Sequence, residues 1–150
     1  MPIDPSYAGR VYPPSRPYRV SREKIREFAD AIGDATPAYH DEAAARALGY
    51  ADVVAPPTFA IVLTMPASYR VTDDPELGLD YSKVVHGAQE FVHRRPLVAG
   101  DEVTVTVAVE SIRAVAGNDM VTVSADVATL DGELVTTAKT MLVARGTAGS

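Results

Sequence analysis

Alternation of apolar and polar residues dominates the second half of the chain. Valine occupies every second position over 103–109, which is the period of a strand with one buried face. The same pattern repeats over 120–130 and 134–144. Asp131-Gly132 is a dipeptide that favours a type I′ hairpin turn, and Gly117-Asn118 marks the turn before it. These three strands are therefore predicted to form an antiparallel meander.

The first half of the chain has the period of helices. Ser21 can cap a helix whose apolar residues recur at the spacing i, i+3, i+4 and i+7. The apolar face consists of Ile25, Phe28, Ala29 and Ile32. Gly33 is expected to end this helix, as a glycine commonly does. A shorter helix is predicted from the cap residue Asp41 to Leu48, with Gly49 directly beyond it.

The segment 56–65 is apolar on almost every side and must therefore be buried. Its residue preferences lean slightly towards a strand, but the paired prolines at its start suit the first turn of a helix. We predict a buried helix that Pro66 ends or kinks. Residues 1–17 are expected to be extended, Tyr18–Val20 to form a short edge strand, and 69–81 to form a polar loop.

Two helices, one buried helix and then a long antiparallel sheet indicate an α+β domain. Residues 83–93 add a further strand to that sheet. The most economical packing is a curved antiparallel sheet wrapped around the central buried helix, which is the hot-dog fold, as a single domain over residues 1–150. One face of each strand covers the helix and the other meets solvent or a second subunit, so a dimer is expected.

Composition narrows the range of partners. The chain has 150 residues and a net charge of −6, with 14 basic against 20 acidic residues, and without a local basic patch no nucleic acid is expected to bind. Three scattered histidines and no cysteine indicate neither a metal site nor a thiolate site, and no cofactor is expected. No apolar run has the length of a membrane span and no signal peptide opens the chain, so the expected location is cytoplasmic, with no membrane contact.

The most specific motif lies between the two predicted helices and reads Gly33-Asp34-Ala35-Thr36-Pro37-Ala38-Tyr39-His40. It resembles the Gly-Asp-x-Asn-Pro-x-His segment of MaoC-like, (R)-specific enoyl-thioester hydratases and (3R)-hydroxyacyl dehydratases. The likeness continues over nearly the whole chain, through residues 21–28, 55–59, 85–87 and 91–101. The chain is most similar to the single-domain actinobacterial proteins of the accessory-subunit type. The resemblance implies a substrate that is a thioester of coenzyme A or of acyl carrier protein, in fatty-acid metabolism.

The resemblance also implies that Asp34 and His40 are catalytic and hold one water molecule for addition to the enoyl double bond. Imidazole titrates near neutral pH, and a carboxylate can fix its tautomer or share the water. The family places the two residues five apart, whereas here the interval is six and Thr36 replaces Asn. One extra residue can shift a side chain by about 3.5 Å, which is enough to separate the pair unless the loop bulges. Alternatively, Asp34 forms an Asx turn and His40 is a surface residue.

Further residues are candidates for binding the thioester. Backbone N–H groups near Thr58 and Phe59 could stabilise the enolate oxygen, although the prolines before them cannot donate. His86-Gly87 could line the thioester channel, with the glycine allowing close approach, but the strand parity favours His86 as a core residue. Arg94-Arg95 could contact coenzyme A phosphates, although a solvated rim is the simpler interpretation. The loop 69–81 is a candidate lid over an acyl tunnel.

Three hypotheses about function follow. The first is a (3R)-hydroxyacyl-thioester dehydratase, an (R)-specific enoyl-thioester hydratase, or a subunit of one, acting as a homodimer or as a heterodimer with a second hot-dog subunit. The second is a non-catalytic subunit that binds the acyl chain or stabilises a partner hot-dog protein, which carries the catalytic Asp and His. The third, a hot-dog thioesterase, is disfavoured by the resemblance of the loop to the water-binding segment.

Overall fold

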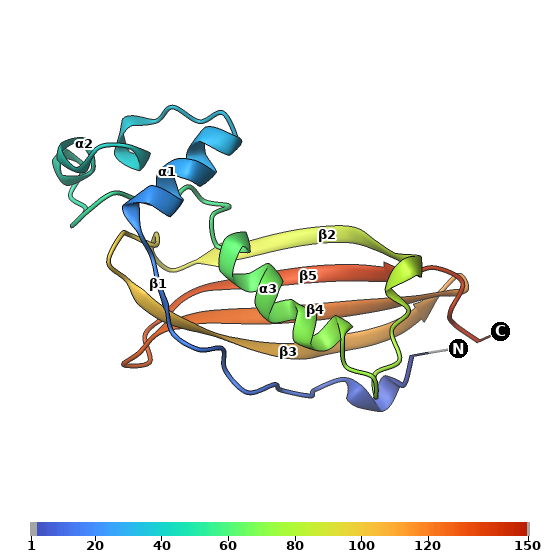
Figure 1. The fold of residues 1–150 in the computed structure, drawn as a ribbon. Coiled ribbons are helices and arrows are strands. Elements are labelled where there is room, and N and C mark those ends of the chain that lie inside the picture. The colour runs from blue at the N-terminus through green and yellow to red at the C-terminus, as the bar shows by residue number, and fades with distance from the viewer. Residues whose placement is uncertain (1–2, 150) are drawn as a thin grey trace.

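The computed structural model of the protein describes residues 3–149 and shows a curved antiparallel sheet with one long helix lying across it (Figure 1). The strands are β1 (Tyr18–Arg19), β2 (Val84–His93), β3 (Glu102–Val115), β4 (Asn118–Thr129) and β5 (Leu134–Ala144). They are arranged in the order β1-β3-β4-β5-β2, and every neighbouring pair is antiparallel. The hot-dog fold predicted from the sequence is confirmed. Met1, Pro2 and Ser150 of the predicted domain lie outside the described residues.

The alternating strands bury one face against the long helix, as predicted. Val103, Val105, Val107 and Val109 are at most 3% exposed. On β4 the buried positions are Val121, Val123, Ala125 and Val127. Because these side chains lie on one face of the sheet and pack against the helix, the apolar core occupies the space between the two.

The β4–β5 turn is not of the type that the sequence predicts, and the β3–β4 turn lies at 116–117, one residue earlier than predicted. Gly132 has a positive φ of 96°, but Asp131 does not, so the β4–β5 turn is not type I′. The Gly132 N–H donates to Thr129 at 3.0 Å, which makes a three-residue loop that ends in a left-handed glycine. Positive φ at two successive residues occurs instead in the β3–β4 turn, at Ala116 (50°) and Gly117 (80°).

Two short helices have the capping residues that the sequence predicts. Helix α1 (Arg22–Ala31) begins at Ser21, whose side chain accepts a hydrogen bond from the Lys24 N–H at 3.1 Å. Helix α2 (Glu42–Ala47) begins at Asp41, which accepts from the Ala44 N–H at 3.1 Å. These bonds satisfy N–H groups that have no partner within the helix. Between the two helices, residues Pro37–Tyr39 form a single 3-10 turn.

The central helix α3 spans Ile61–Thr72, so it begins later and ends later than predicted. Turns occupy residues 57–60, and Pro66 lies inside the helix. A proline in a helix interior costs about 3 kcal/mol. Pro66 itself is exposed. The helix continues past it because Ala67 and Val71, further along the helix, are buried in the core. No helix among residues 3–149 is long and apolar enough to span a membrane.

The N-terminal segment 3–17, hereafter the strap, runs along the outer side of β3 and covers that edge of the sheet (Figure 1). The N–H groups of Gly9, Tyr12 and Ser15 donate to β3 carbonyls at 2.7 to 2.9 Å. Strand β2 forms the opposite edge, and no strand within residues 3–149 pairs with its outer side. The sheet therefore has one covered edge and one open edge.

Candidate functional site

Residues 21–55, which include α1 and α2, form a cap at one end of the sheet (Figure 1). Its last residues pair with the segment that follows β2. The Ala55 N–H donates to the Leu97 carbonyl at 2.8 Å, and the Ala99 N–H donates to the Val53 carbonyl at 2.9 Å. Two parts of the chain that are about forty residues apart therefore lie side by side, and they bring the cap next to the end of β2.

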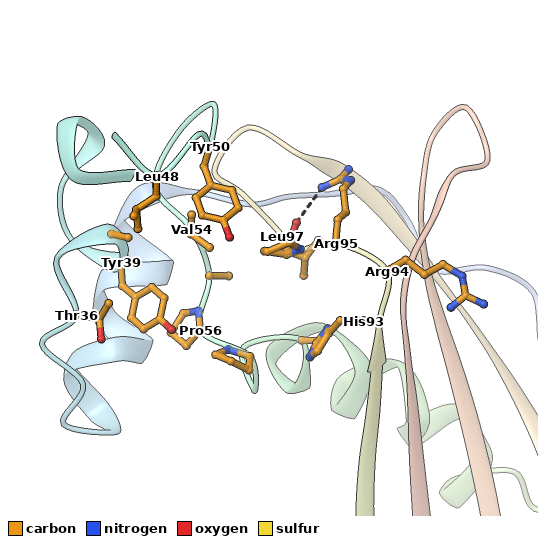
Figure 2. Close-up of a pocket in the computed structure, with 15 residues that line it drawn as sticks. Thr36, Tyr39, Leu48, Tyr50, Val54, Pro56, His93, Arg94, Arg95 and Leu97 are labelled. Atoms are coloured by element: carbon orange, nitrogen blue, oxygen red, sulfur yellow. Dashed lines mark hydrogen bonds between the residues drawn. The ribbon is translucent and has the colours of Figure 1, made fainter. Parts of the chain in front are cut away.

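A cavity of about 450 Å³ lies between the cap and the residues at the end of β2. This volume is within the range of small-molecule sites. Its walls are mostly apolar and include Leu48 and Val54 from the cap. Figure 2 shows three polar rings facing this space: Tyr39 and Tyr50 from the cap, and His93 from the end of β2.

Asp34 and His40 lie on the cap but are not part of the cavity lining. The Asp34 carboxylate accepts hydrogen bonds from the Thr36 hydroxyl at 2.6 Å and from the Thr36 N–H at 3.0 Å, which makes an Asx turn. The His40 Nε2 lies 2.9 Å from the main-chain carbonyl of Asp34. Because a carbonyl only accepts, Nε2 carries the hydrogen. The loop therefore joins the imidazole to the Asp34 main chain instead of to its carboxylate.

The contacts of Asp34 also affect its acidity. Hydrogen bonds from the Thr36 hydroxyl and N–H, in that order, lower the pKa of Asp34 below its ordinary value, and His40 contributes in the same direction. An aspartate with a lowered pKa is a weaker base at neutral pH. Asp34 is thus present as a carboxylate whose primary role in the described structure is to shape the loop.

Tyr39 occupies the position five residues after Asp34, which is the position of the histidine in the motif that this loop resembles. Its ring is half-buried and lines the cavity. Burial raises the pKa of Tyr39 above its ordinary value, and the nearby charge of Asp34 adds to this effect. The side chain that enters the cavity from this loop is therefore a protonated phenol. Counting five residues from Asp34 would have identified Tyr39 in the sequence.

Contrary to the prediction, Thr58 and Phe59 do not line the cavity. The Phe59 N–H already donates to the Pro56 carbonyl at 2.9 Å in the turn before α3. The Phe59 side chain is 0% exposed and packs edge-to-face on Phe28. Thr58 is exposed. The cavity wall at this point consists instead of Pro56, Pro57 and Ala60.

The structure contradicts a core position for His86, whereas binding of a thioester by His86 and Gly87 stays a prediction. His86 is exposed on the edge strand and is not a core residue. Its Nε2 lies 3.0 Å from the Ala88 carbonyl, and its ring lines a second, smaller cavity of about 100 Å³ between α3 and β2. A Cβ atom on Gly87 would lie 2.7 Å from the Met141 methyl group. The glycine therefore makes room for Met141 at an irregularity in the pairing of β2 with β5.

The two arginines after β2 have different environments. Arg95 pairs with Asp101 at 2.9 Å and with Glu133 at 3.2 Å, and these hydrogen bonds raise its pKa. Arg95 is therefore a structural residue. Arg94 is exposed at the cavity margin, and its side chain points away from the cavity in Figure 2. This fits the solvated rim that the sequence favours.

Residues 69–81, the candidate lid, are not a loop throughout, because 69–72 belong to the last turn of α3. Tyr69 of α3 and Tyr81 beyond the loop line the second cavity. The centre of the loop is bound by the strap: the Tyr12 hydroxyl donates to Asp74 at 2.8 Å, and the Tyr7 hydroxyl donates to Glu76 at 3.0 Å. These two bonds tie the loop to the strap on β3.

An ion-pair cluster connects the parts of the cap. Arg22 of α1 contacts both oxygens of Asp52, at 2.9 and 2.8 Å, and Glu42 of α2 at 2.8 Å. The hydrogen bonds from Arg22 are the largest cause of the lowered pKa of Asp52, which is about 2. Because the pKa is lowered in the folded state, this contact stabilises the fold above pH ~4 and is lost as the pH falls towards about 2.

We therefore expect Asp52→Asn to lower the free energy of unfolding by about 1 kcal/mol at pH 7. Arg22 is 45% exposed, so solvent screens part of the interaction. The difference between wild type and variant, measured by urea denaturation, should shrink between about pH 4 and 2. Glu102→Gln removes a more exposed pair with Arg19 and should change little at any pH. An Asp52→Asn effect that stays constant with pH would contradict the assignment.

The fold, with a cavity beneath a helical cap, defines a hot-dog protein of the MaoC-like dehydratase class. A solved MaoC-like dehydratase is 39% identical to this chain with a TM-score of 0.87, over 93% of this chain and 42% of its own. The chain therefore spans less than half the length of that protein. The HadBC (3R-hydroxyacyl-ACP dehydratase) complex of Mycobacterium tuberculosis is 33% identical with a TM-score of 0.82, over 91% of this chain and 96% of the matched one.

The chain belongs to the family described as FAS1-like, dehydratase domain region, whose model matches residues 6–138. A UPF0336 protein of Saccharopolyspora erythraea is 58% identical over 148 residues, which cover 99% of this chain and 95% of the relative. The resemblance to the single-domain actinobacterial type is confirmed.

Proposed function

We propose that this chain is the acyl-binding subunit of a (3R)-hydroxyacyl-thioester dehydratase of fatty-acid metabolism, and that a partner hot-dog chain carries the catalytic Asp and His. The observation that carries the proposal is the arrangement of the 33–40 loop. Tyr39, and neither Asp34 nor His40, reaches the cavity. General-base catalysis needs contacts of about 2.6–3.2 Å to the water that reacts, whereas Asp34 and His40 make their contacts within the loop.

The cavity supports a role in binding the acyl chain. Its apolar walls suit a hydrocarbon, because burial of apolar surface is the main favourable term for such a ligand. The proposed substrate is an acyl thioester of coenzyme A or of acyl carrier protein. Among the described residues, the aromatic side chains with polar atoms that line this cavity are Tyr39, Tyr50 and His93.

The open edge of β2 supports assembly with a second hot-dog chain. An exposed edge strand of ten residues presents unpaired N–H and C=O groups and is normally covered. A similar protein of known structure is described as a complex of two chains. We expect the outer side of β2 to pair with a partner, either a second copy or a catalytic chain.

The proposal is tested by assaying hydration of a short enoyl-coenzyme A with the purified chain and with the chain co-expressed with hot-dog proteins encoded beside it. We expect activity only in the mixture. In that mixture, Asp34→Asn and His40→Ala should each retain activity within about twofold of the unmodified complex. Turnover by the chain alone would contradict the proposal, and release of free thiol without hydration would indicate a thioesterase.

The second candidate function is a complete hydratase or dehydratase in which Asp34 and His40 are catalytic. The observation in its favour is that both residues are half-buried on one loop and are joined through the Asp34 carbonyl at 2.9 Å. Under this alternative the chain is active alone, and Asp34→Asn and His40→Ala each abolish that activity. The same assay therefore distinguishes the two functions.

A further inference from the structure

The strap bonds to the outer edge of β3 through its main chain (Figure 1). Three N–H groups of the strap donate to β3 carbonyls. In return, the Val109 N–H donates to the Arg10 carbonyl at 2.9 Å, and the Val105 N–H donates to the Ser15 hydroxyl at 2.9 Å. Strand β1 continues along the same edge. The strap therefore occupies the backbone groups of β3 that an added strand would use.

The outer side of the strap is a poor template for a further strand. Pro13 and Pro14 have no N–H group to donate, and their carbonyls already accept hydrogen bonds from the Arg70 guanidinium of α3. Proline on an edge is one of the ways in which proteins prevent sheet extension. The strap thus covers β3 without offering an equivalent edge in its place.

Side-chain contacts anchor the strap to other parts of the molecule. The Arg10 guanidinium lies over the rings of Tyr7 and Tyr12, 4.9 and 5.4 Å from their centroids, and contacts Glu76 at 3.1 Å. At the other end of the strap, the Ile3 N–H donates to the Asp119 carboxylate at 3.2 Å. The strap is therefore held by contacts outside β3 as well as by its bonds to that strand.

The part of β3 beneath the strap is well suited to pairing with a copy of itself. Residues 103–109 are all valine, threonine or alanine, and no charge lies between Glu102 and Glu110. A segment of high β-propensity with neither charge nor proline is prone to pair with identical segments when it is exposed, and no like charges oppose one another across such a pair. A bare β3 edge would therefore accept a second copy of this chain.

The edge formed by β2 has no such cover. It contains no proline, and Val85 and Val92 are 41% and 43% exposed. We infer that the strap blocks β3 so that only β2 can pair, which rests on the pairing of β2 suggested under the proposed function. A chain with one open edge forms a closed pair, whereas a chain with two open edges adds copies without limit. When the strap is displaced, β3 pairs antiparallel with β3 of a second copy.

The test first blocks β2, so that β3 is examined alone. The Arg94 N–H donates inward to the Val135 carbonyl at 2.9 Å, and because this direction alternates along a strand, the Gln89 N–H points outward. Gln89→Pro therefore removes an outward donor and retains the main-chain bonds to β5. Light scattering after size-exclusion chromatography gives the mass of the full chain. We expect the mass of one chain, 15.9 kDa.

Release of the strap should then double that mass. Tyr12→Pro with Ser15→Pro removes two N–H donors to β3. Added to Gln89→Pro, this pair should give about twice the mass of one chain, and with β2 intact it should give a mass that rises with protein concentration. Val11→Pro with Arg16→Pro is the matched control, because neither N–H bonds to β3 within residues 3–149. This control should leave the mass unchanged.

A milder variant applies if the proline pair unfolds the chain. Tyr12→Phe with Glu76→Ala removes side-chain anchors and retains the ring at position 12. Combined with Gln89→Pro, it should make exchange of the Val109 N–H at least about tenfold faster, and a fraction of doubled mass should grow with concentration.

Faster exchange without any doubled mass, or exchange that stays unchanged, would overturn the inference. A folded proline-pair variant that keeps the mass of the Gln89→Pro chain would also overturn it. The proposed pairing of β2 fails separately: a pair formed by the unmodified chain that Gln89→Pro does not split would contradict that pairing. The effect of strap release is measured relative to the Gln89→Pro chain in either case.

Discussion

Replacement of Phe59 by alanine is expected to lower the free energy of unfolding by about 3–5 kcal/mol. The side chain is 0% exposed, and its ring meets that of Phe28 edge-to-face at 5.6 Å and 87°. Truncation removes buried apolar surface and leaves a cavity that the surrounding core fills only in part. Urea denaturation followed by circular dichroism measures the loss, provided that unfolding is two-state.

The neighbouring residue provides a matched control. Thr58 is exposed, and Thr58→Ala should change the free energy of unfolding by no more than about 0.5 kcal/mol. Phe28 belongs to α1 and Phe59 to the turn before α3, so the pair connects the cap to the central helix. We therefore also expect Phe59→Ala to weaken thioester binding in the cavity below the cap. A loss of stability under about 1 kcal/mol would show that the pair is not a main connection.

The sequence is sufficient to predict the sheet because burial and period coincide in the strands. The valines of 103–109 are buried at alternating positions, as their spacing requires. The boundaries of α3 are a different case. A proline at position 66 predicts an end to the helix from local preference alone. The helix continues because Ala67 and Val71 pack against the sheet, and this tertiary contribution has no local signal in the sequence.

The candidate site is harder to predict from the sequence than the sheet is. The motif identifies the 33–40 loop correctly as part of the cap, but it cannot show that Thr36 binds the Asp34 carboxylate or that His40 turns to the main chain. His93 gives no signal at all in the sequence. Its position at the cavity depends on pairing of residues 53–55 with 97–99, which are distant in sequence and whose register no local pattern specifies.

Tyr39→His is expected to give the chain alone measurable hydration of a short enoyl-coenzyme A, at least about 100-fold above the unmodified chain. Position 39 faces the cavity, and the substitution restores the spacing of five residues between Asp and His. The charge of Asp34 already acts on the Tyr39 hydroxyl, so an imidazole at this position lies within the influence of the same carboxylate. A correctly placed general base contributes about 10²- to 10⁴-fold. Steady-state loss of the enoyl absorbance measures the rate.

Two controls determine whether the gain comes from a carboxylate–imidazole pair. Tyr39→Gln places a polar side chain of similar reach without a titrating group and should remain inactive. Tyr39→His combined with Asp34→Asn should lose most of the gain, because the imidazole then has no carboxylate to orient it. A Tyr39→His protein that folds normally and shows no hydration would mean that the water-binding position lies elsewhere. In that case the cavity under the cap would only bind the acyl group of the substrate, and a partner subunit would carry out the reaction.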